Sequence, residues 1–375
     1  MTAQTPASSQ RYARQQVLAE IGSAGQEALA HARVLVVGAG GLGSPVLLYL
    51  AAAGVGQKNA GGAIGIIDDD VVDTSNLQRQ ILFREADQGC SKATSATQQL
   101  KALNSDVALK ALAQRLNADN VLTIFSHYDI IIDGSDNFDT KFLVNDAAVR
   151  LGLPVVYGSI LGFEGQASVF WAEHGPCYRC LYPAPPESYV PNCAEFGTLG
   201  GIAGFIGSVQ AVEACKLALG LPHCRDQGLE TLIGHLLLSD ARNWDIRKLR
   251  IDKNPDCPVC SLATDAIEMP GLTTPACETS IPKNLSMADL NNLLESGIPF
   301  ALLDVREAAE WANGHLEGAQ HLPLGQLLTQ PSTLELLDSS QTLIVYCQHG
   351  IRSQTAVRFL RERGYNALNL IVHWP

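Results

Sequence analysis

The stretch Arg33-Val-Leu-Val-Val-Gly-Ala-Gly-Gly-Leu-Gly-Ser44 decides the first fold of this 375-residue chain. Its first half is typical of a buried strand, its glycines of a tight turn, and residues 44–53 have a helical composition. A glycine turn lets the backbone approach a phosphate at a helix N-terminus, where unpaired N–H groups favour an anion. The stretch therefore predicts a strand, turn and helix of a doubly wound α/β domain that binds a nucleotide.

Acidic and polar residues follow two further predicted strands. Residues 63–67 end in Asp68-Asp69-Asp70, and residues 130–132 end in Asp133-Gly134-Ser135-Asp136-Asn137. Ligands bind at the carboxyl ends of strands in doubly wound sheets, and a carboxylate such as Asp68 accepts hydrogen bonds from ribose hydroxyls. Arg79 and Lys92 would neutralise a triphosphate, which favours ATP over a dinucleotide, although solvated surface charges explain the two cations equally well.

Two Cys-x-x-Cys pairs, Cys177/Cys180 and Cys257/Cys260, lie far apart in the chain. Four thiolates suit tetrahedral Zn²⁺, and a site that leaves no coordination position open is structural. A redox dithiol is the rival interpretation, but neither pair lies in a βαβ context and two pairs occur together. We therefore expect one structural zinc site.

A separate cysteine, Cys347, follows the predicted strand 342–346 in a loop that contains Gly350, Arg352 and Ser353. Successive backbone N–H groups in a loop that enters a helix surround a sulfur anion and stabilise a persulfide. A phosphatase loop is the rival interpretation, but it requires Cys-x5-Arg, and the spacing here is Cys-x4-Arg. With a further strand predicted at residues 300–304, the pattern indicates a second, smaller α/β unit that handles sulfur.

The composition limits the class of protein. An apolar content of 46% with 17% charged residues is typical of an ordinary folded protein. The formal net charge of −12 argues against a nucleic-acid or anionic-membrane surface, because those contacts need clustered Lys and Arg. Residues 1–10 do not resemble a signal peptide, and the apolar runs fall short of the roughly 18 residues of a membrane helix. We expect a cytoplasmic protein with reduced thiols.

From Arg11 to Cys260 the chain resembles the MoeB/ThiF family of ubiquitin-activating-like adenylyltransferases. The motifs that carry this resemblance are Gly38–Gly43, Gly54–Gly56, Ser75–Gln80, Ser135–Asn137, Glu164–Gln166 and the two cysteine pairs. From about residue 281 the chain is similar to a rhodanese domain, through Leu303–Glu307, Gly314-His315, Gly318-Ala319 and the Cys347 loop. The resemblance implies a Rossmann-like ThiF domain at residues 1–262, a linker at residues 263–280 and a rhodanese-like domain at residues 281–375.

The activity that this resemblance implies is ATP-dependent adenylylation of the C-terminal glycine of a ubiquitin-like sulfur carrier of the MoaD or ThiS type. A persulfide on Cys347 would then supply sulfur to give a thiocarboxylate, with a cysteine desulfurase or another persulfide donor upstream, in molybdenum cofactor biosynthesis. The resemblance assigns ribose to Asp68 and Mg²⁺ to Asp136. The other nucleotide and phosphate contacts that it implies are Gly40, Gly41, Ser75, Asn76, Leu77, Gln78, Arg79, Lys92 and Asn137.

Two further residues take a role from the resemblance. Arg14 matches an arginine that in this family reaches into the neighbouring subunit's site, which implies a homodimer with composite sites; a surface charge is the alternative. Cys193 lies where many relatives carry a cysteine on a mobile crossover loop, assigned to a thioester or disulfide step. A small buried hydrophobic residue is the alternative for Cys193.

The chain departs from the rhodanese pattern after Leu368, where relatives continue through a Gly-Gly-Ile turn and a last helix. Four alternatives therefore stay open. The chain could adenylylate a carrier with an impaired second domain, or serve thiamine or tRNA thiolation. It could also be an NAD-dependent oxidoreductase with a zinc staple, or a non-catalytic scaffold that binds the carrier.

Overall fold

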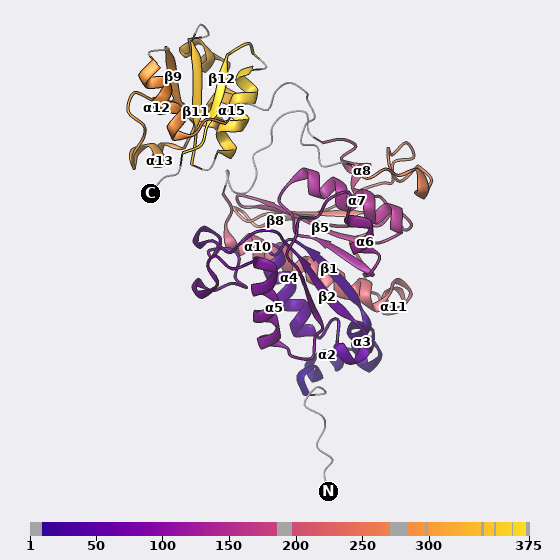
Figure 1. The fold of residues 1–375 in the computed structure, drawn as a ribbon. Coiled ribbons are helices and arrows are strands. Elements are labelled where there is room, and N and C mark those ends of the chain that lie inside the picture. The colour runs from indigo at the N-terminus through magenta and orange to yellow at the C-terminus, as the bar shows by residue number, and fades with distance from the viewer. Residues whose placement is uncertain are drawn as a thin grey trace. The chain divides into compact units, whose positions relative to one another are not determined.

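The computed structural model in Figure 1 describes residues 10–185, 197–270, 284–296, 299–338, 341–348, 350–361 and 363–372. Its contacts divide the chain into two compact units, Met1–Thr273 and Thr274–Pro375. Each unit is an α/β structure with its own sheet. The domain bounds inferred from the sequence stay a prediction.

The sheet of the first unit has eight strands in the order β3-β2-β1-β4-β5-β6-β7-β8, and the strands from β3 to β5 are parallel. Because the strand order reverses beside β1, a crevice is expected at the carboxyl ends of β1 and β4. The expected doubly wound architecture is confirmed. The strands are β1 (Arg33–Val37), β2 (Ala63–Ile67), β3 (Leu109–Leu112), β4 (Ile130–Asp133), β5 (Val155–Leu161), β6 (Glu164–Phe170), β7 (His235–Asp240) and β8 (Asp245–Arg250).

Helices cover both faces of this sheet, and each face has its own apolar core. Val34 and Val36 of β1 belong to one core, and Leu35 and Val37 belong to the other, because successive side chains of a strand point to opposite faces. The helices are α2 (Ala13–Gln16), α3 (Gly22–His31), α4 (Gly43–Ala53), α5 (Lys92–Leu103), α6 (Val121–Phe125), α7 (Phe138–Leu151), α8 (Tyr178–Leu181), α10 (Gly200–Leu219) and α11 (Leu221–Asp226).

The turn between β1 and α4 depends on glycine. Gly38 has a φ of +88°, a left-handed conformation that side chains disfavour. A Cβ on Gly43, the first residue of α4, would overlap the carbonyl oxygen of Gly38. The turn is therefore tight enough to bring the N-terminus of α4 directly to the end of β1.

Helix α10 is the one described helix that is long and apolar enough to cross a membrane, with 20 residues and a mean hydropathy of 1.4. In the fold it packs on β5 and β6 and against α4. Gly207 allows the close approach to α4, because a Cβ there would collide with Pro45. The apolar residues of α10 thus belong to the core of the first unit.

The second unit contains a parallel sheet in the order β10-β9-β11-β12. Apolar cores lie on its two faces, with Val345 of β11 in one and Ile344 in the other. The strands predicted at residues 300–304 and 342–346 are confirmed as β9 (Phe300–Asp304) and β11 (Thr342–Tyr346). The other elements are β10 (Gln320–His321), β12 (Ala367–Leu370), α12 (Met287–Ser296), α13 (Ala308–Ala312), α14 (Leu324–Thr329) and α15 (Ile351–Arg361).

The start of the predicted linker packs against the first unit. Ile267 is buried, and its carbonyl oxygen accepts a hydrogen bond of 2.8 Å from the Arg150 guanidinium of α7. Residues 271–283, which hold the rest of the predicted linker, lie outside the described residues.

Candidate functional site

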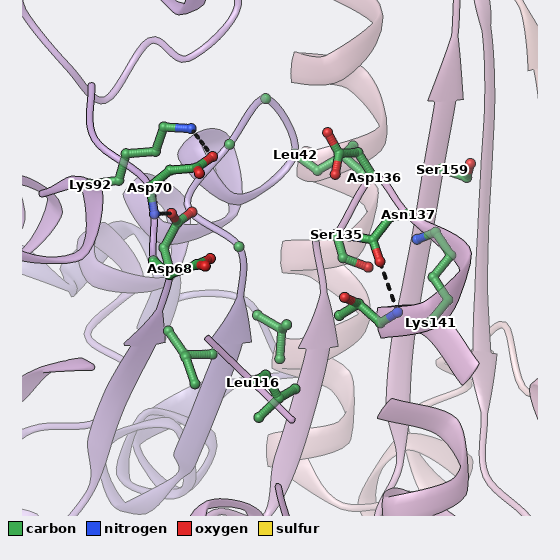
Figure 2. Close-up of a pocket in the computed structure, with 18 of the residues that line it drawn as sticks. Leu42, Asp68, Asp70, Lys92, Leu116, Ser135, Asp136, Asn137, Lys141 and Ser159 are labelled. Carbon is green, nitrogen blue, oxygen red and sulfur yellow. Dashed lines mark hydrogen bonds and ion pairs between the residues drawn. The ribbon is translucent and has the colours of Figure 1, made fainter. Parts of the chain in front are cut away.

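A cavity of about 520 Å³ opens at the carboxyl ends of the central parallel strands of the first unit. Figure 2 shows Asp68, Asp70 and Lys92 on one side of it, and the loop that carries Ser135 and Asp136 on the other. The strand ends that the sequence analysis singled out therefore converge. The predicted nucleotide residues among its lining residues are Gly40, Gly41, Asp68, Arg79, Lys92, Asp136 and Asn137.

Asp68 is fixed between the end of β2 and the glycine turn. Its carboxylate accepts hydrogen bonds from the backbone N–H of Ala39 at 2.8 Å and from that of Asp70 at 2.9 Å. Burial raises the pKa of the Asp68 carboxyl above its ordinary value, and the Ala39 hydrogen bond opposes that rise. The side chain is thus held beside the turn, which is the position expected of a ribose ligand.

Lys92 and Arg79 are the cations of the cavity that the sequence predicted. The Lys92 ammonium lies 2.9 Å from Asp70, and its side chain is 7% exposed, whereas that of Asp70 is 70% exposed. The Arg79 guanidinium donates to the carbonyl oxygen of Ser75 at 3.0 Å, and its stem lies over Gly41. Both side chains therefore line the cavity together with Gly40 and Gly41 of the glycine turn.

The first four residues of the motif Ser75–Gln80 support the cavity beside Arg79 but do not line it. Ser75 donates to the Asp73 carboxylate through its N–H at 2.8 Å and its hydroxyl at 2.6 Å, and Asn76 accepts from the Asp73 N–H at 3.3 Å. The predicted contacts Ser75, Asn76, Leu77 and Gln78 are not among the lining residues of the cavity. They form the turn that presents Arg79.

The remaining predicted residues of the first unit have different surroundings. Asn137 lines the cavity, but its side-chain oxygen also caps α7 by accepting from the Thr140 N–H at 2.9 Å. Asp136 is exposed at the cavity rim. Arg14 is exposed on α2 and is not a lining residue. Cys193 falls within residues 186–196, outside the described residues.

The cavity also contains polar residues that the sequence analysis did not assign. Gln80 is only 4% exposed, and within the described part of the chain its side-chain oxygen has no hydrogen-bond partner. Lys141, Tyr157 and Ser159 also line the cavity. Two features of the sequence could have pointed to these residues. Gln80 stands in the Ser75–Gln80 motif, and Lys141 is a charged residue directly before the apolar residues 142–144.

The four cysteines of the two Cys-x-x-Cys pairs come together as expected. Their sulfur atoms all lie within 4.8 Å of one another, with Cys177 3.5 Å from Cys257 and Cys180 3.5 Å from Cys260. Tetrahedral Zn²⁺ with Zn–S bonds of about 2.3 Å requires sulfur separations near 3.8 Å, so the cluster fits this ion. Burial raises the pKa of the Cys260 thiol to about 12, and a bound cation would favour the thiolate instead.

Helix α7 holds the first cysteine pair in place. Asn145 accepts a hydrogen bond of 2.7 Å from the Tyr178 N–H, and the buried Asp146 carboxylate pairs with Arg179 at 2.6 Å. Tyr178 and Arg179 are the two residues between Cys177 and Cys180. The cluster is thus anchored to the same helix whose N-terminus borders the cavity.

Three donors among the described residues form hydrogen bonds to the Cys347 sulfur in the second unit. The donors are the Gly350 N–H at 3.1 Å, the Ser353 N–H at 3.4 Å and the Ser353 hydroxyl at 3.3 Å. Gly350 has a φ of +83°, which turns the backbone N–H groups toward the sulfur. The loop geometry expected for an anionic sulfur is therefore present, at the N-terminus of α15.

Two arginines hold this loop from either side. Arg352 forms two hydrogen bonds of 2.6 Å to the Glu310 carboxylate of α13. Arg306 pairs with Asp304 at 2.7 Å and also approaches the Gln348 side chain at 3.4 Å. The Asp304–Arg306 pair thus contacts the residue that follows Cys347.

Comparison with protein families gives the same division of the chain. Residues 12–259 match the model of the ThiF family, and residues 286–374 match that of the rhodanese-like domain.

The chain belongs to the ThiF family.

Relatives of this ThiF-family chain cover nearly all of its length. The probable adenylyltransferase/sulfurtransferase MoeZ of Mycobacterium tuberculosis is 43% identical over 97% of this chain and 92% of its own. The adenylyltransferase and sulfurtransferase MOCS3 of Mus musculus is 40% identical over 94% of this chain and 80% of its own. The sulfur carrier protein adenylyltransferase of Thermus thermophilus is 48% identical over 67% of this chain and 90% of its own.

A solved structure supports the fold. MccB of E. coli has a TM-score of 0.58 at 21% identity, and the match covers 69% of this chain and 76% of that chain. At this identity the similarity shows the fold alone.

Proposed function

We propose that this ThiF-family chain adenylylates the C-terminal glycine of a ubiquitin-like sulfur carrier and passes the carrier sulfur from a persulfide on Cys347. One observation carries the first step: Asp68, Arg79, Lys92 and Asp136 line one cavity beside the N-terminus of α4. The names of the relatives, which are adenylyltransferases and sulfurtransferases, support both steps.

Catalysis of the adenylylation step depends mainly on electrostatic stabilisation of the transition state. A carboxylate oxygen of the carrier attacks the α-phosphorus of ATP, the bond to the bridging oxygen of the β-phosphate breaks, and pyrophosphate leaves. Negative charge on the phosphate oxygens is stabilised by Arg79, by Lys92 and by the N–H groups at the start of α4. Because Asp70 is exposed, a phosphate can replace it as the partner of the buried Lys92.

Asp68 and Asp136 take the two carboxylate roles. Asp68, fixed beside the glycine turn, accepts hydrogen bonds from the ribose hydroxyls. Asp136, exposed at the rim, offers carboxylate oxygens of the kind that Mg²⁺ prefers. Mg²⁺ would supply charge neutralisation between the phosphates.

The sulfur step uses the cradle around Cys347. The terminal sulfur of the Cys347 persulfide attacks the acyl carbon of the adenylate, and AMP leaves, so that an acyl disulfide joins carrier and enzyme. A second thiol attacks the Cys347 sulfur, releases the thiocarboxylate and forms a disulfide that a cellular thiol then reduces. Cys193 is our prediction for that second thiol. The three hydrogen bonds to the Cys347 sulfur stabilise the anionic states.

The partners and setting follow from the same resemblance. We assign the carrier to the MoaD or ThiS type, in molybdenum cofactor biosynthesis, and the sulfur to a cysteine desulfurase or another persulfide donor. Arg14 lies outside the cavity of its own chain, which supports a role in a partner subunit's site and hence a homodimer. A persulfide and a four-thiolate zinc cluster require reduced thiols, which supports a cytoplasmic location.

Exchange of labelled pyrophosphate into ATP tests the adenylylation step. We expect exchange only when ATP and a carrier with an intact C-terminal glycine are both present; a carrier that lacks this glycine is the control. Protection of the first unit against proteolysis by NAD, and not by ATP, would contradict the proposal and favour an oxidoreductase. Adenylate formation without thiocarboxylate would favour a chain that only activates the carrier.

The zinc assignment has a separate test. Metal analysis should find one Zn²⁺ per chain, and Cys257→Ser should lose it and lower the melting temperature, because the binding energy of the metal is folding energy. Cys90→Ser, at an exposed cysteine outside the cluster, is the matched control and should keep its zinc. Full zinc content in the Cys257→Ser protein would refute the four-cysteine site.

A further inference from the structure

A buried ion pair lies directly behind the cavity wall. The Lys141 ammonium of α7 is 3.0 Å from the Asp133 carboxylate at the end of β4. The two residues are 6% and 2% exposed, respectively, and Lys141 is itself a lining residue. Figure 2 shows Lys141 on the side of the cavity that carries Ser135, Asp136 and Asn137. Neither member of the pair has a role in the reaction as described so far.

Asp133 and Lys141 each form further hydrogen bonds to residues around the cavity. The other Asp133 oxygen accepts hydrogen bonds from the Ser135 N–H at 2.9 Å and the Ser135 hydroxyl at 2.6 Å. The Lys141 ammonium also donates to the carbonyl oxygen of Gly158 on β5 at 2.9 Å. The pair therefore links the loop that precedes Asp136 to α7 and to β5.

A third buried side chain completes the arrangement. The Gln210 amide of α10 donates to the carbonyl oxygen of Asp133 at 2.9 Å and to that of Val156 at 3.1 Å. These bonds fix the backbone of Asp133 from the opposite face of the sheet. The position of the Asp133 carboxylate is thus fixed, and its hydrogen bonds to Ser135 fix the position of Ser135 in turn.

The charge balance depends on Lys141. A buried carboxylate that loses its cation is strongly unfavourable. The unpaired Asp133 carboxylate would also add negative charge behind a cavity that contains Asp136 and is proposed to bind phosphates, which would disfavour phosphate binding. Lys141 removes this effect because it neutralises Asp133 without occupying the cavity itself.

We infer that Lys141 is a positioning residue for adenylyl transfer, acting through Asp133 and Ser135 to hold Asp136 at the cavity rim. The inference rests on the proposed function, because Asp136 matters only if the cavity binds ATP with its cation. Lys141 contributes to the rate of the reaction through geometry, since a misplacement of about 1 Å can cost about 100-fold in rate.

Three variants separate positioning from stability in carrier-dependent pyrophosphate exchange with the full chain. Lys141→Met should lower kcat by about 100-fold and change the KM for ATP by less than about threefold. Lys141→Arg, which keeps the charge, should recover most of the lost rate. Ser135→Ala, which removes the hydroxyl hydrogen bond to Asp133 and keeps the one from the Ser135 N–H, should lower kcat by about tenfold, more than any change in the folded fraction explains.

Lys216→Met is the matched control. Lys216 pairs with the buried carboxylate of Glu213 on α10, away from the cavity lining, at 2.6 Å. Its loss should lower the melting temperature and leave kcat unchanged. This variant therefore shows how much stability is lost when a buried carboxylate loses its partner cation at a place away from the cavity lining.

The outcomes are distinguishable. A wild-type kcat in both Lys141→Met and Ser135→Ala would overturn the inference and leave the proposed function intact. A loss of kcat that only matches the fraction of unfolded protein would also overturn it. If Lys141→Met does not fold, Ser135→Ala decides, and a wild-type kcat in that variant is the contradicting result. No exchange by the wild-type protein would remove the proposed function, and this inference with it.

Discussion

Replacing Cys347 with alanine will abolish formation of the carrier thiocarboxylate and leave acyl adenylate formation unchanged. Cys347 is the described cysteine whose sulfur lies in a cradle of three hydrogen-bond donors, so its loss removes the group that carries the persulfide. The proposed adenylate site is a cavity of the other unit, on a different sheet. Transfer of sulfur from thiosulfate should disappear together with the thiocarboxylate.

Mass spectrometry of the carrier after reaction with ATP and a persulfide donor reads both steps at once. Cys90→Ala, at an exposed cysteine of the first unit, is the matched control and should give the wild-type yield of thiocarboxylate. An unchanged thiocarboxylate yield from the Cys347→Ala protein would defeat the sulfur-relay hypothesis. A wild-type chain that makes adenylate without thiocarboxylate would indicate that the second unit is impaired.

Replacing Asp136 with alanine will suppress carrier-dependent pyrophosphate exchange by about 1,000-fold. The carboxylate is the proposed ligand of Mg²⁺, and the loss of its charge neutralisation costs several kcal/mol in the transition state, at about 1.4 kcal/mol per tenfold in rate. Because Asp136 is exposed, its removal should leave the melting temperature close to that of the wild type.

Asp139→Ala provides the comparison for this variant. Asp139 is an exposed aspartate in the first turn of α7, three residues beyond Asp136, and it is not a lining residue of the cavity. Exchange should proceed at the wild-type rate, with at most a small loss of stability from the helix dipole. Exchange that persists near the wild-type rate in Asp136→Ala would refute the ATP site as proposed.

The strands that carry the motifs could be predicted from local sequence. The strand predicted at residues 63–67 has the same bounds in the structure, because a short apolar segment with three isoleucines lies between glycines and aspartates. Strand β3 was missed, as were β5 to β8, β10 and β12. The β3 residues Leu109–Leu112 form an edge strand with Lys110 exposed and no β-branched residue, so the alternation that indicates a strand is absent.

The candidate site was predicted in part. Asp68 and Arg79 line the cavity as predicted, because a glycine turn and the ends of strands can be recognised from a few neighbouring residues. The predicted contacts from Ser75 to Gln78 do not line it. Gln80 and Lys141 were not assigned. Their importance comes from burial beside the cavity, and burial of one polar side chain cannot be read from its neighbours in sequence.

The sequence by itself determined the strand, turn and helix of the glycine motif and the chemistry of the cysteine pairs and the Cys347 loop, because each of these depends on residues within about one turn or strand of one another. Only the tertiary structure decided which distant groups meet. The cysteine pairs were expected to share one ion, but only the structure shows that Cys177 lies beside Cys257, and that Lys141 contacts both Asp133 and the Gly158 carbonyl. The physical reason is that these distances depend on how helices pack on the sheet, where a buried charge must find its partner.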